Sequence, residues 1–226
     1  MLKQGMTRPT GRTSFKVIKN KKATDPSFWE LLNRANPFAE ASKGIRSWKA
    51  KNFHNLIKPL VKIGIAKLFR MPTFYGSLYL VKTTANGVTT DYGLASLRVV
   101  TTAGVGYIVD AFQNTVELEN MKYHGLGTGS NSEAVGDTAL QTELTSEYTG
   151  NVRATGTTAE GASANIYSSV ATNTLDATPG AALREHGIFS ANSSGVLLDR
   201  TVYGAITLAS GDALQSTYQL TFTAGS

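Results

Sequence analysis

The sequence predicts a mainly β protein: an antiparallel, jelly-roll-like β-sandwich preceded by a basic N-terminal arm and short amphipathic helices. Two observations lead to this fold class. From residue 71 onwards, many short segments rich in Thr, Ser, Ala, Gly and Val alternate with turn clusters, which is typical of sandwiches. Before residue 71, Lys and Arg dominate, and apolar residues recur at approximately helical spacing. We therefore expect an arm with short helices over residues 1–70 and a β-sandwich domain over residues 71–226.

The net charge of +6 hides an asymmetry between these two parts. Residues 1–70 carry 16 Lys and Arg against three acidic residues, a net charge of +13, whereas residues 71–226 carry 6 against 13, a net charge of −7. Such a division predicts an arm that docks on something acidic. The chain has no cysteine, which excludes disulfides, thiolate metal sites and a cysteine nucleophile. No apolar run approaches the roughly 18 residues that a membrane span needs, so we expect no membrane partner.

The arm begins with residues 1–24, which have scattered positive charge and little apolar periodicity. We expect an extended or disordered segment there in the free protein. Asp25 and Pro26 then form a helix-start signal, with Asp as the N-cap and Pro at the first helical position. A short helix that contains Trp29 follows, and it should end before Pro37.

Residues 45–70 contain a second set of apolar residues with lysines between them. The set approximates helical spacing and consists of Trp48, Phe53, Leu56, Ile57, Leu60, Ile63 and Ile65. Pro59 and Gly64 interrupt it, which predicts two short amphipathic pieces or one kinked helix. Three roles remain open for this stretch: packing on the chain's own domain, binding to a membrane surface, and docking on a partner protein.

The β region opens with a hairpin signal. Asn86 and Gly87 form a dipeptide that favours a two-residue turn between strands. Residues 102–115 fit either a short helix or a buried strand, because periodicity does not decide between them. Further strands are expected around residues 122–126, 148–157, 164–174, 185–189, 196–208 and 213–223. In the last of these, apolar residues fall on one face at Leu214, Tyr218, Leu220 and Phe222.

The stretch "YHGLGTGSNSEAVGDTALQTEL" places three glycines at alternate positions, Gly125, Gly127 and Gly129. A phosphate-binding P-loop needs Gly-Lys-Ser or Gly-Lys-Thr, whereas Ser130 follows the last glycine here. A dinucleotide fingerprint needs a third glycine three residues after the second, and that position is also Ser130. We therefore expect no cofactor. The glycines are interpreted as structural, permitting positive φ and close backbone approach at a strand end.

The chain shows no local catalytic motif. His54, His124 and His186 do not form an HExxH pattern, and the Glu beside His186 makes only a dipeptide with it. His124, next to the glycine stretch, is a candidate ligand or base, but a structural histidine is the favoured interpretation. No metal site is expected, since the aspartates near turns lack calcium-loop spacing. We expect a protein that is not an enzyme.

Residues 116–226 resemble structural proteins of tailed-bacteriophage virions. The resemblance is carried by the "YHGLGTGSNSEAVGDTALQTEL" stretch, by "RATGTT", and by "REHGIFSANSSGVLLDRTVYGAITLASGDALQSTYQLTFTAG" near the C-terminus. It implies a virion location, reached by assembly in the host cytoplasm, with a role as a capsid cement or decoration protein on the major capsid protein. A tail, neck or baseplate role is the alternative. It also implies a homo-oligomer, a trimer or a dimer.

The front 70 residues carry no resemblance, and their role is expected from charge and apolarity alone. We expect lysines to give attraction to the partner and large apolar side chains to supply most of the affinity. The expected partner-binding residues are Lys16, Lys19, Lys21, Lys22, Trp29, Trp48, Phe53, Leu56, Ile57 and Leu60. A different class of function is nucleic-acid binding, because the charge of +13 in this part would also neutralise phosphates.

Overall fold

The computed structural model describes residues 43–98, 100–177 and 180–225, so the helix start at Asp25 lies outside the described residues. The described part contains nine strands and the helices α2, α3 and η1. The strands are β1 (Thr73–Thr83), β2 (Thr89–Arg98), β3 (Tyr123–Gly127), β4 (Ala154–Thr155), β5 (Thr157–Glu160), β6 (Ile166–Thr174), β7 (Ala181–Phe189), β8 (Leu197–Leu208) and β9 (Ala213–Thr223).

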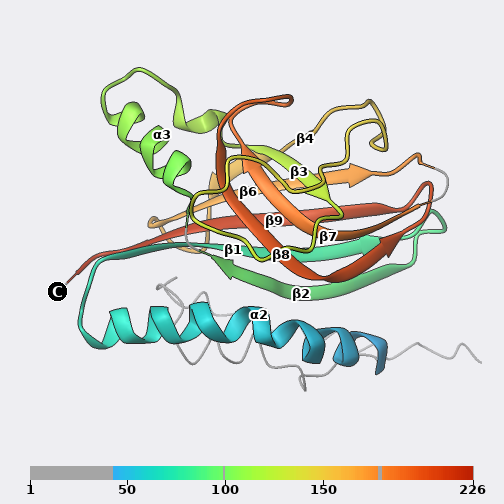
Figure 1. Cartoon of the computed structure of the whole chain (residues 1–226), viewed down its shortest axis with the longest axis horizontal. Helices are drawn as coiled ribbons and strands as arrows, with labels where there is room; N and C mark the ends of the chain where they lie inside the picture. Colours follow the sequence, from blue (N-terminus) through green and yellow to red (C-terminus); the bar gives the residue numbers. More distant parts are fainter. Residues whose placement is uncertain (1–42, 99, 178–179, 226) are drawn as a thin grey trace, which may run out of the picture.

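The strands form two antiparallel sheets, and the core lies between them (Figure 1). One sheet has five strands in the order β2-β1-β9-β6-β5, and the other has four in the order β4-β3-β7-β8. Leu78 and Leu214 of the first sheet share a buried cluster with Leu126 and Leu183 of the second. The expected fold class, an antiparallel β-sandwich, is confirmed.

The last strand, β9, runs through the middle of the five-stranded sheet. It pairs with β1 on one side and β6 on the other along its whole length. The expected alternation is present, because Leu214, Tyr218 and Leu220 are buried, while Phe222 near the end is exposed. A C-terminal strand with two antiparallel neighbours joins the first and middle parts of the chain into one sheet.

Helix α3 (Thr102–Phe112) resolves the choice between helix and strand for residues 102–115. Thr101 is the N-cap, and its hydroxyl accepts a hydrogen bond from the Gly104 amide at 2.9 Å. The same hydroxyl donates to the Leu197 carbonyl at 2.7 Å, which fixes the start of the helix against β8. The 3-10 helix η1 (Leu118–Asn120) follows and returns the chain to β3.

The hairpin between β1 and β2 is present, but its turn is longer than the two residues expected. Thr84 and Val88 close the loop through a backbone hydrogen bond, and the Gly87 amide donates to the Thr84 carbonyl. The loop therefore holds three residues, Ala85, Asn86 and Gly87. Gly87 has φ +80°, the left-handed conformation that commonly ends a three-residue hairpin loop.

Helix α2 (Lys43–Leu68) is one continuous helix, so of the two expected forms the two short pieces are wrong and a single helix is present. Pro59 lies inside it and removes one backbone hydrogen bond. Packing offsets this loss, because Leu56, Leu60 and Ile63 are buried against side chains of the five-stranded sheet. Figure 1 shows α2 running along one side of the sandwich, where it contacts β2 and β8.

Two side chains of α2 join the edge strands of the two sheets. Asn52, which is 1% exposed, donates from its amide nitrogen to the Ala95 carbonyl of β2 at 2.6 Å. Its amide oxygen accepts from the Gly204 amide of β8 at 2.9 Å, and the Trp48 indole donates to the Gly204 carbonyl at 2.8 Å. Edge strands carry unpaired backbone groups, and α2 satisfies some of them here. Residues 43–68 thus pack as part of the sandwich, across the expected domain boundary at residue 70.

Candidate functional site

The three glycines of the conspicuous stretch are required by close packing. None of them has positive φ, so the first of the two expected reasons does not apply. A Cβ on Gly127 would lie 2.5 Å from the Glu185 Oε1 atom and 2.5 Å from the Thr142 carbonyl oxygen. A Cβ on Gly129 would also lie 2.5 Å from the Glu185 Oε1 atom. The second expected reason, close approach, therefore explains the motif.

The group that approaches Gly127 and Gly129 is the carboxylate of Glu185 in β7, which is fully buried, whereas Gly125 is approached by the side chains of Phe189 and Glu143. The Oε1 atom of Glu185 accepts from the backbone amides of Gly129 at 3.0 Å and Thr142 at 2.7 Å. Its Oε2 atom accepts from the Gln141 amide at 3.0 Å and from the Arg200 guanidinium at 2.9 Å. The glycine stretch thus forms an anion site, but the anion is part of the same chain.

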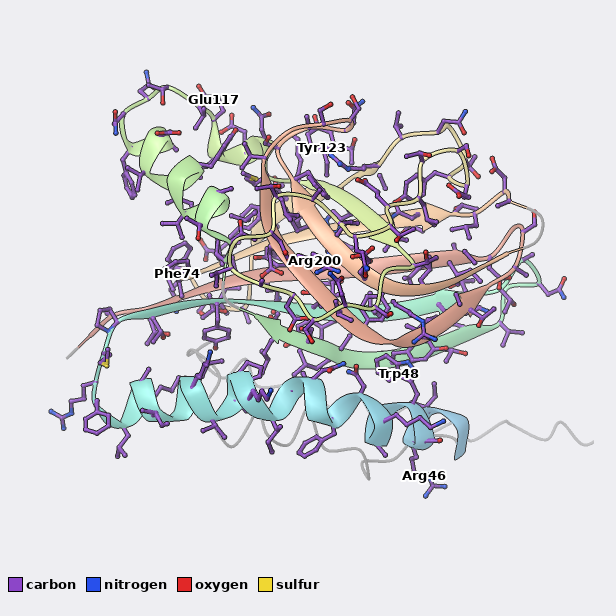
Figure 2. All side chains as sticks on the ribbon, in the orientation of Figure 1. Arg46, Trp48, Phe74, Glu117, Tyr123 and Arg200 are labelled. Carbon is purple, nitrogen blue, oxygen red and sulfur yellow. The ribbon has the colours of Figure 1, made fainter. Side chains whose placement is uncertain are left out.

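Arg200 extends this cluster to the loop that covers it. Its guanidinium also contacts the Asp137 carboxylate at 2.9 Å and the Asn131 side-chain oxygen. Figure 2 shows Arg200 near the middle of the four-stranded sheet, beneath the loop between β3 and β4. A buried charge is stable only when it is paired and hydrogen-bonded, and Arg200 and Glu185 supply this to each other. The loop between β3 and β4 is therefore held to the sheet by Arg200, through Asn131 and Asp137, and by Glu185, through Gln141 and Thr142.

A second arginine anchors the far end of the same loop. Arg153 forms an ion pair with Glu143 and lies over the ring of Phe189, with its carbon Cζ 3.3 Å from the ring centroid. The same guanidinium donates to the carbonyls of Ala191 and Ser194. Residues 128–153 are therefore tied to β7 and to the β7–β8 turn, so the "DTALQTEL" segment is a structural strap across the sheet.

The candidate histidine, His124, lies inside the protein. Its Nδ1 atom is 3.0 Å from the Nε2 atom of His186, and its Nε2 atom is 2.9 Å from the Ser169 hydroxyl. Both rings are buried, and burial lowers the pKa of His124 to about 3. Burial and the neighbouring ring lower the pKa of His186 as well. The pair is out of reach of a substrate, so the structural interpretation of His124 holds for this site.

The described residues show no group of three or more metal-ligating side chains. Among the same residues, no helix is both long enough and apolar enough to cross a membrane. The polar clusters around Glu185 and His124 are buried. The expected partner-binding residues that the structure describes all lie on α2, where they would have to reach the surface.

Only some of the expected partner-binding residues reach that surface. The four lysines between Lys16 and Lys22, and Trp29, lie outside the described residues. Leu56 and Leu60 are corrected from partner contacts to core residues, because both are at most 2% exposed and pack on the five-stranded sheet.

The other three expected residues divide between the core and the surface. Trp48 and Phe53 are partly buried against clusters of the sandwich. Figure 2 shows Trp48 directed towards the strands and Arg46 directed away from them. Ile57 is 41% exposed and remains on the outside.

The outward side of α2 carries a row of large apolar residues. Helical spacing in the sequence did not distinguish this row from the buried residues Leu56, Leu60 and Ile63. The row's spacing of four, four and three residues places it on one helix face, and Leu68 is 77% exposed. We call this row the outer stripe; it consists of Ile57, Val61, Ile65 and Leu68. The segment from Lys43 to Arg70 around it contains eight Lys and Arg and no acidic residue.

A groove of about 1140 Å³ runs beside the outer stripe, between α2, β8 and the loop of residues 130–135. Trp48, Pro59 and Tyr203 supply apolar parts of its wall. Four exposed cationic side chains outnumber the one acidic residue of its lining, Glu133, and we call it the basic groove; they are Lys51, Lys58, Lys62 and Arg184. Arg200, which is ion-paired, also lines it. Ile57 lies where the stripe borders the groove.

A second exposed apolar surface lies on α3 and η1, residues 102–120, which we call the acidic lobe. Figure 1 shows it projecting from the end of the sandwich, away from α2. Phe112 is 85% exposed, and three other apolar residues are exposed around it: Val105, Val109 and Leu118. Asp110, Glu117 and Glu119 are also exposed, and the segment has no Lys or Arg.

The sequence carried weak signals for some residues that it did not identify. Glu185 beside Arg184, and Arg200 beside Asp199, are charged residues within largely apolar strand segments, and such residues are rarely buried unless they are paired. Asn52 had no such signal, because an asparagine on a helix is ordinarily exposed. Comparison with known proteins adds no assignment: no family model matches the chain, and no curated protein is significantly similar to it.

Proposed function

We propose that this protein is a non-enzymatic structural component of a bacteriophage particle, attached to other virion proteins through the outer stripe of α2. The observation that carries the proposal is the stripe itself. Four large apolar side chains stand in a row on a helix whose charges are all positive. Exposed apolar rows of this kind mark protein interaction sites, because isolated soluble proteins rarely expose them.

Two further points support a structural role. The glycine stretch and the buried histidines, which are the natural places to look for chemistry, are both occupied by internal contacts. The resemblance of residues 116–226 to virion proteins points in the same direction. We place the protein on the capsid, as a cement or decoration protein on the major capsid protein lattice, with the tail, neck or baseplate as the alternative.

The physics of the stripe favours a protein partner over nucleic acid. Burial of a large aliphatic side chain contributes roughly 1.5–3 kcal/mol, whereas an exposed ion pair contributes about 0–1 kcal/mol. Three or four stripe residues therefore dominate the affinity, and the lysines around them select an acidic or mixed surface. A phosphate backbone offers no apolar surface that would cover Val61 and Ile65.

The test uses particles assembled without this protein, to which purified full-length variants are added. The stripe variant is Val61→Ser/Ile65→Ser, and the matched control is Val88→Ser/Val152→Ser, which removes two exposed valines elsewhere. We expect the stripe variant to bind particles about tenfold or more weakly, measured by co-sedimentation. The control should bind like the unmodified protein. Equal binding by both variants overturns the proposal.

Nucleic-acid binding would give a different result. The unmodified protein would then bind DNA with an affinity that falls steeply with salt concentration. The stripe variant would bind DNA equally well, since it keeps every lysine. That combination, with unchanged particle binding, would reassign the basic helix to phosphate recognition.

A further inference from the structure

The basic groove and the acidic lobe are complementary in charge and in shape. The groove holds four exposed cations against one carboxylate, Glu133, and has a concave, partly apolar wall. The lobe holds Asp110, Glu117 and Glu119 and a convex tip on which Phe112 is almost fully exposed. Exposed aromatic side chains that fill a partner's pocket are typical anchors of protein interfaces. Each surface offers what the other lacks.

The two surfaces do not meet within one molecule. Figure 2 places Glu117 of the lobe above the sandwich, whereas Trp48, which lines the groove, lies below the sheets beside α2. The groove reaches Thr101, the N-cap of α3, but the exposed end of the lobe projects away from α2 (Figure 1). Contact between the surfaces therefore requires two molecules.

We propose that copies of this protein associate head to tail, with the acidic lobe of one copy seated in the basic groove of the next. Phe112 enters the groove near Pro59, and Glu117 and Glu119 face Lys58 and Lys62. Val61, Ile65 and Leu68 of the outer stripe lie outside the groove lining and stay free for the particle, whereas Ile57 borders the groove. The inference goes beyond the proposed function, because it concerns self-association and does not require the particle.

Such a contact is heterologous, since two different patches of the same chain meet. Heterologous contacts close into a ring when the rotation between copies allows it, and otherwise extend as a chain. Helix α3 has 11 residues and is therefore only about 16 Å long. A helix of this length buries less surface area than a standard interface, which buries about 800 Å² on each partner. Association in solution is thus concentration-dependent, and it strengthens when copies are held side by side.

The experiment uses charge reversal on each surface of the full-length protein. The groove variant is Lys58→Glu/Lys62→Glu, and the lobe variant is Glu117→Lys/Glu119→Lys. We expect the unmodified protein to sediment faster as its concentration rises, and each variant alone to stay monomeric. An equimolar mixture of the two variants should associate again, because the reversed lobe of one fits the reversed groove of the other.

Two controls separate this contact from general charge and apolar effects. Glu160→Lys/Asp176→Lys reverses two exposed acids outside the lobe and should leave association unchanged. Phe112→Ser should weaken association by about tenfold or more, whereas Phe69→Ser, which alters an exposed phenylalanine on the other side, should not. Circular dichroism checks that every variant remains folded.

Three results would overturn the inference. The unmodified protein staying monomeric at high concentration is the first. The second is a mixture of the reversed variants that fails to associate although the unmodified protein does. The third is a groove variant whose loss of association comes with a lower unfolding midpoint, which would mean that Lys58 and Lys62 stabilise the fold and not the contact between copies. Particle binding that still depends on the outer stripe would leave the proposed function standing in each case.

Discussion

Glu185 and His186 are neighbours in β7, and their side chains enter two opposite environments. Successive residues of a strand face opposite sides of a sheet. Glu185 faces outwards, beneath the loop of residues 128–144, where its carboxylate is paired with Arg200. His186 faces inwards, against His124 of β3, and burial keeps both rings neutral. Buried polar groups thus stay charged where the chain supplies an opposite charge, and lose their charge where it does not.

The charged side of this comparison predicts the largest effect. Glu185→Ala leaves the guanidinium of Arg200 buried beside a cavity and removes the acceptor of three backbone amides. Breaking one partner of a buried pair costs about 3–5 kcal/mol. We expect the free energy of unfolding to fall by that amount, measured by urea denaturation of the full chain.

A double variant sharpens this prediction. Glu185→Gln/Arg200→Met removes both charges and keeps similar volume, so it should cost less than Glu185→Ala alone. A double variant that is less stable than the single one would mean that Arg200 acts independently of Glu185, through Asp137 and Asn131.

The neutral side predicts a pH dependence. The unfolded histidines titrate near pH 6.5, whereas the pKa of His124 in the folded protein is about 3 and that of His186 is also lowered. Above pH 6.5 neither state takes up these protons, and the contribution to stability is constant. Below pH 6.5 the unfolded chain binds more protons, so the free energy of unfolding falls by up to about 1.4 kcal/mol per pH unit for each histidine. For His124 the fall continues to about pH 3.

Urea denaturation between about pH 7.5 and about pH 5 measures this slope. Proton NMR of the imidazole rings provides the independent check, because neither buried ring should change its chemical shift over that range. A ring that titrates near 6.5 in the folded protein would contradict the neutral pair.

The glycines of β3 lie on the same face as Glu185. Substituting them should reduce the free energy of unfolding by a smaller amount, through steric overlap. Gly127→Ala places a Cβ 2.5 Å from the Glu185 carboxylate and from the Thr142 carbonyl oxygen, and overpacking of this kind typically costs about 1–3 kcal/mol. Gly136→Ala is the matched control in the same loop, because nothing lies within 4 Å of its Cβ position. We expect the control to change stability by about 0.5 kcal/mol or less. Equal effects of the two substitutions would contradict the packing explanation.

The sandwich was predictable because its signals are local. The alternation in β9 and the hairpin between β1 and β2 were each predicted from a few adjacent residues. The roles of the polar clusters were not predictable in this way, because their partners are distant in the chain. Gly129 and Glu185 are 56 residues apart, and Asn52 and Gly204 are 152 residues apart. Trp48 and Leu56 illustrate the same limit. Helical spacing identifies an apolar face, but it does not tell whether the chain's own sandwich or a partner protein covers that face.

The smallest expected change in the free energy of unfolding comes from two buried serines on the inward face, where the histidines lie. Ser169 and Ser216 are both fully buried, on the paired strands β6 and β9. The Ser169 hydroxyl contacts His124, whereas the Ser216 hydroxyl has no hydrogen-bond partner among the described residues. Ser169→Ala should cost about 1 kcal/mol, because it leaves a histidine nitrogen without its partner. Ser216→Ala should be neutral or stabilising, because it removes a hydroxyl that is buried without compensation. Thermal and urea unfolding of both variants measure the difference, and a larger loss for Ser216→Ala would mean that its hydroxyl has a partner in solution.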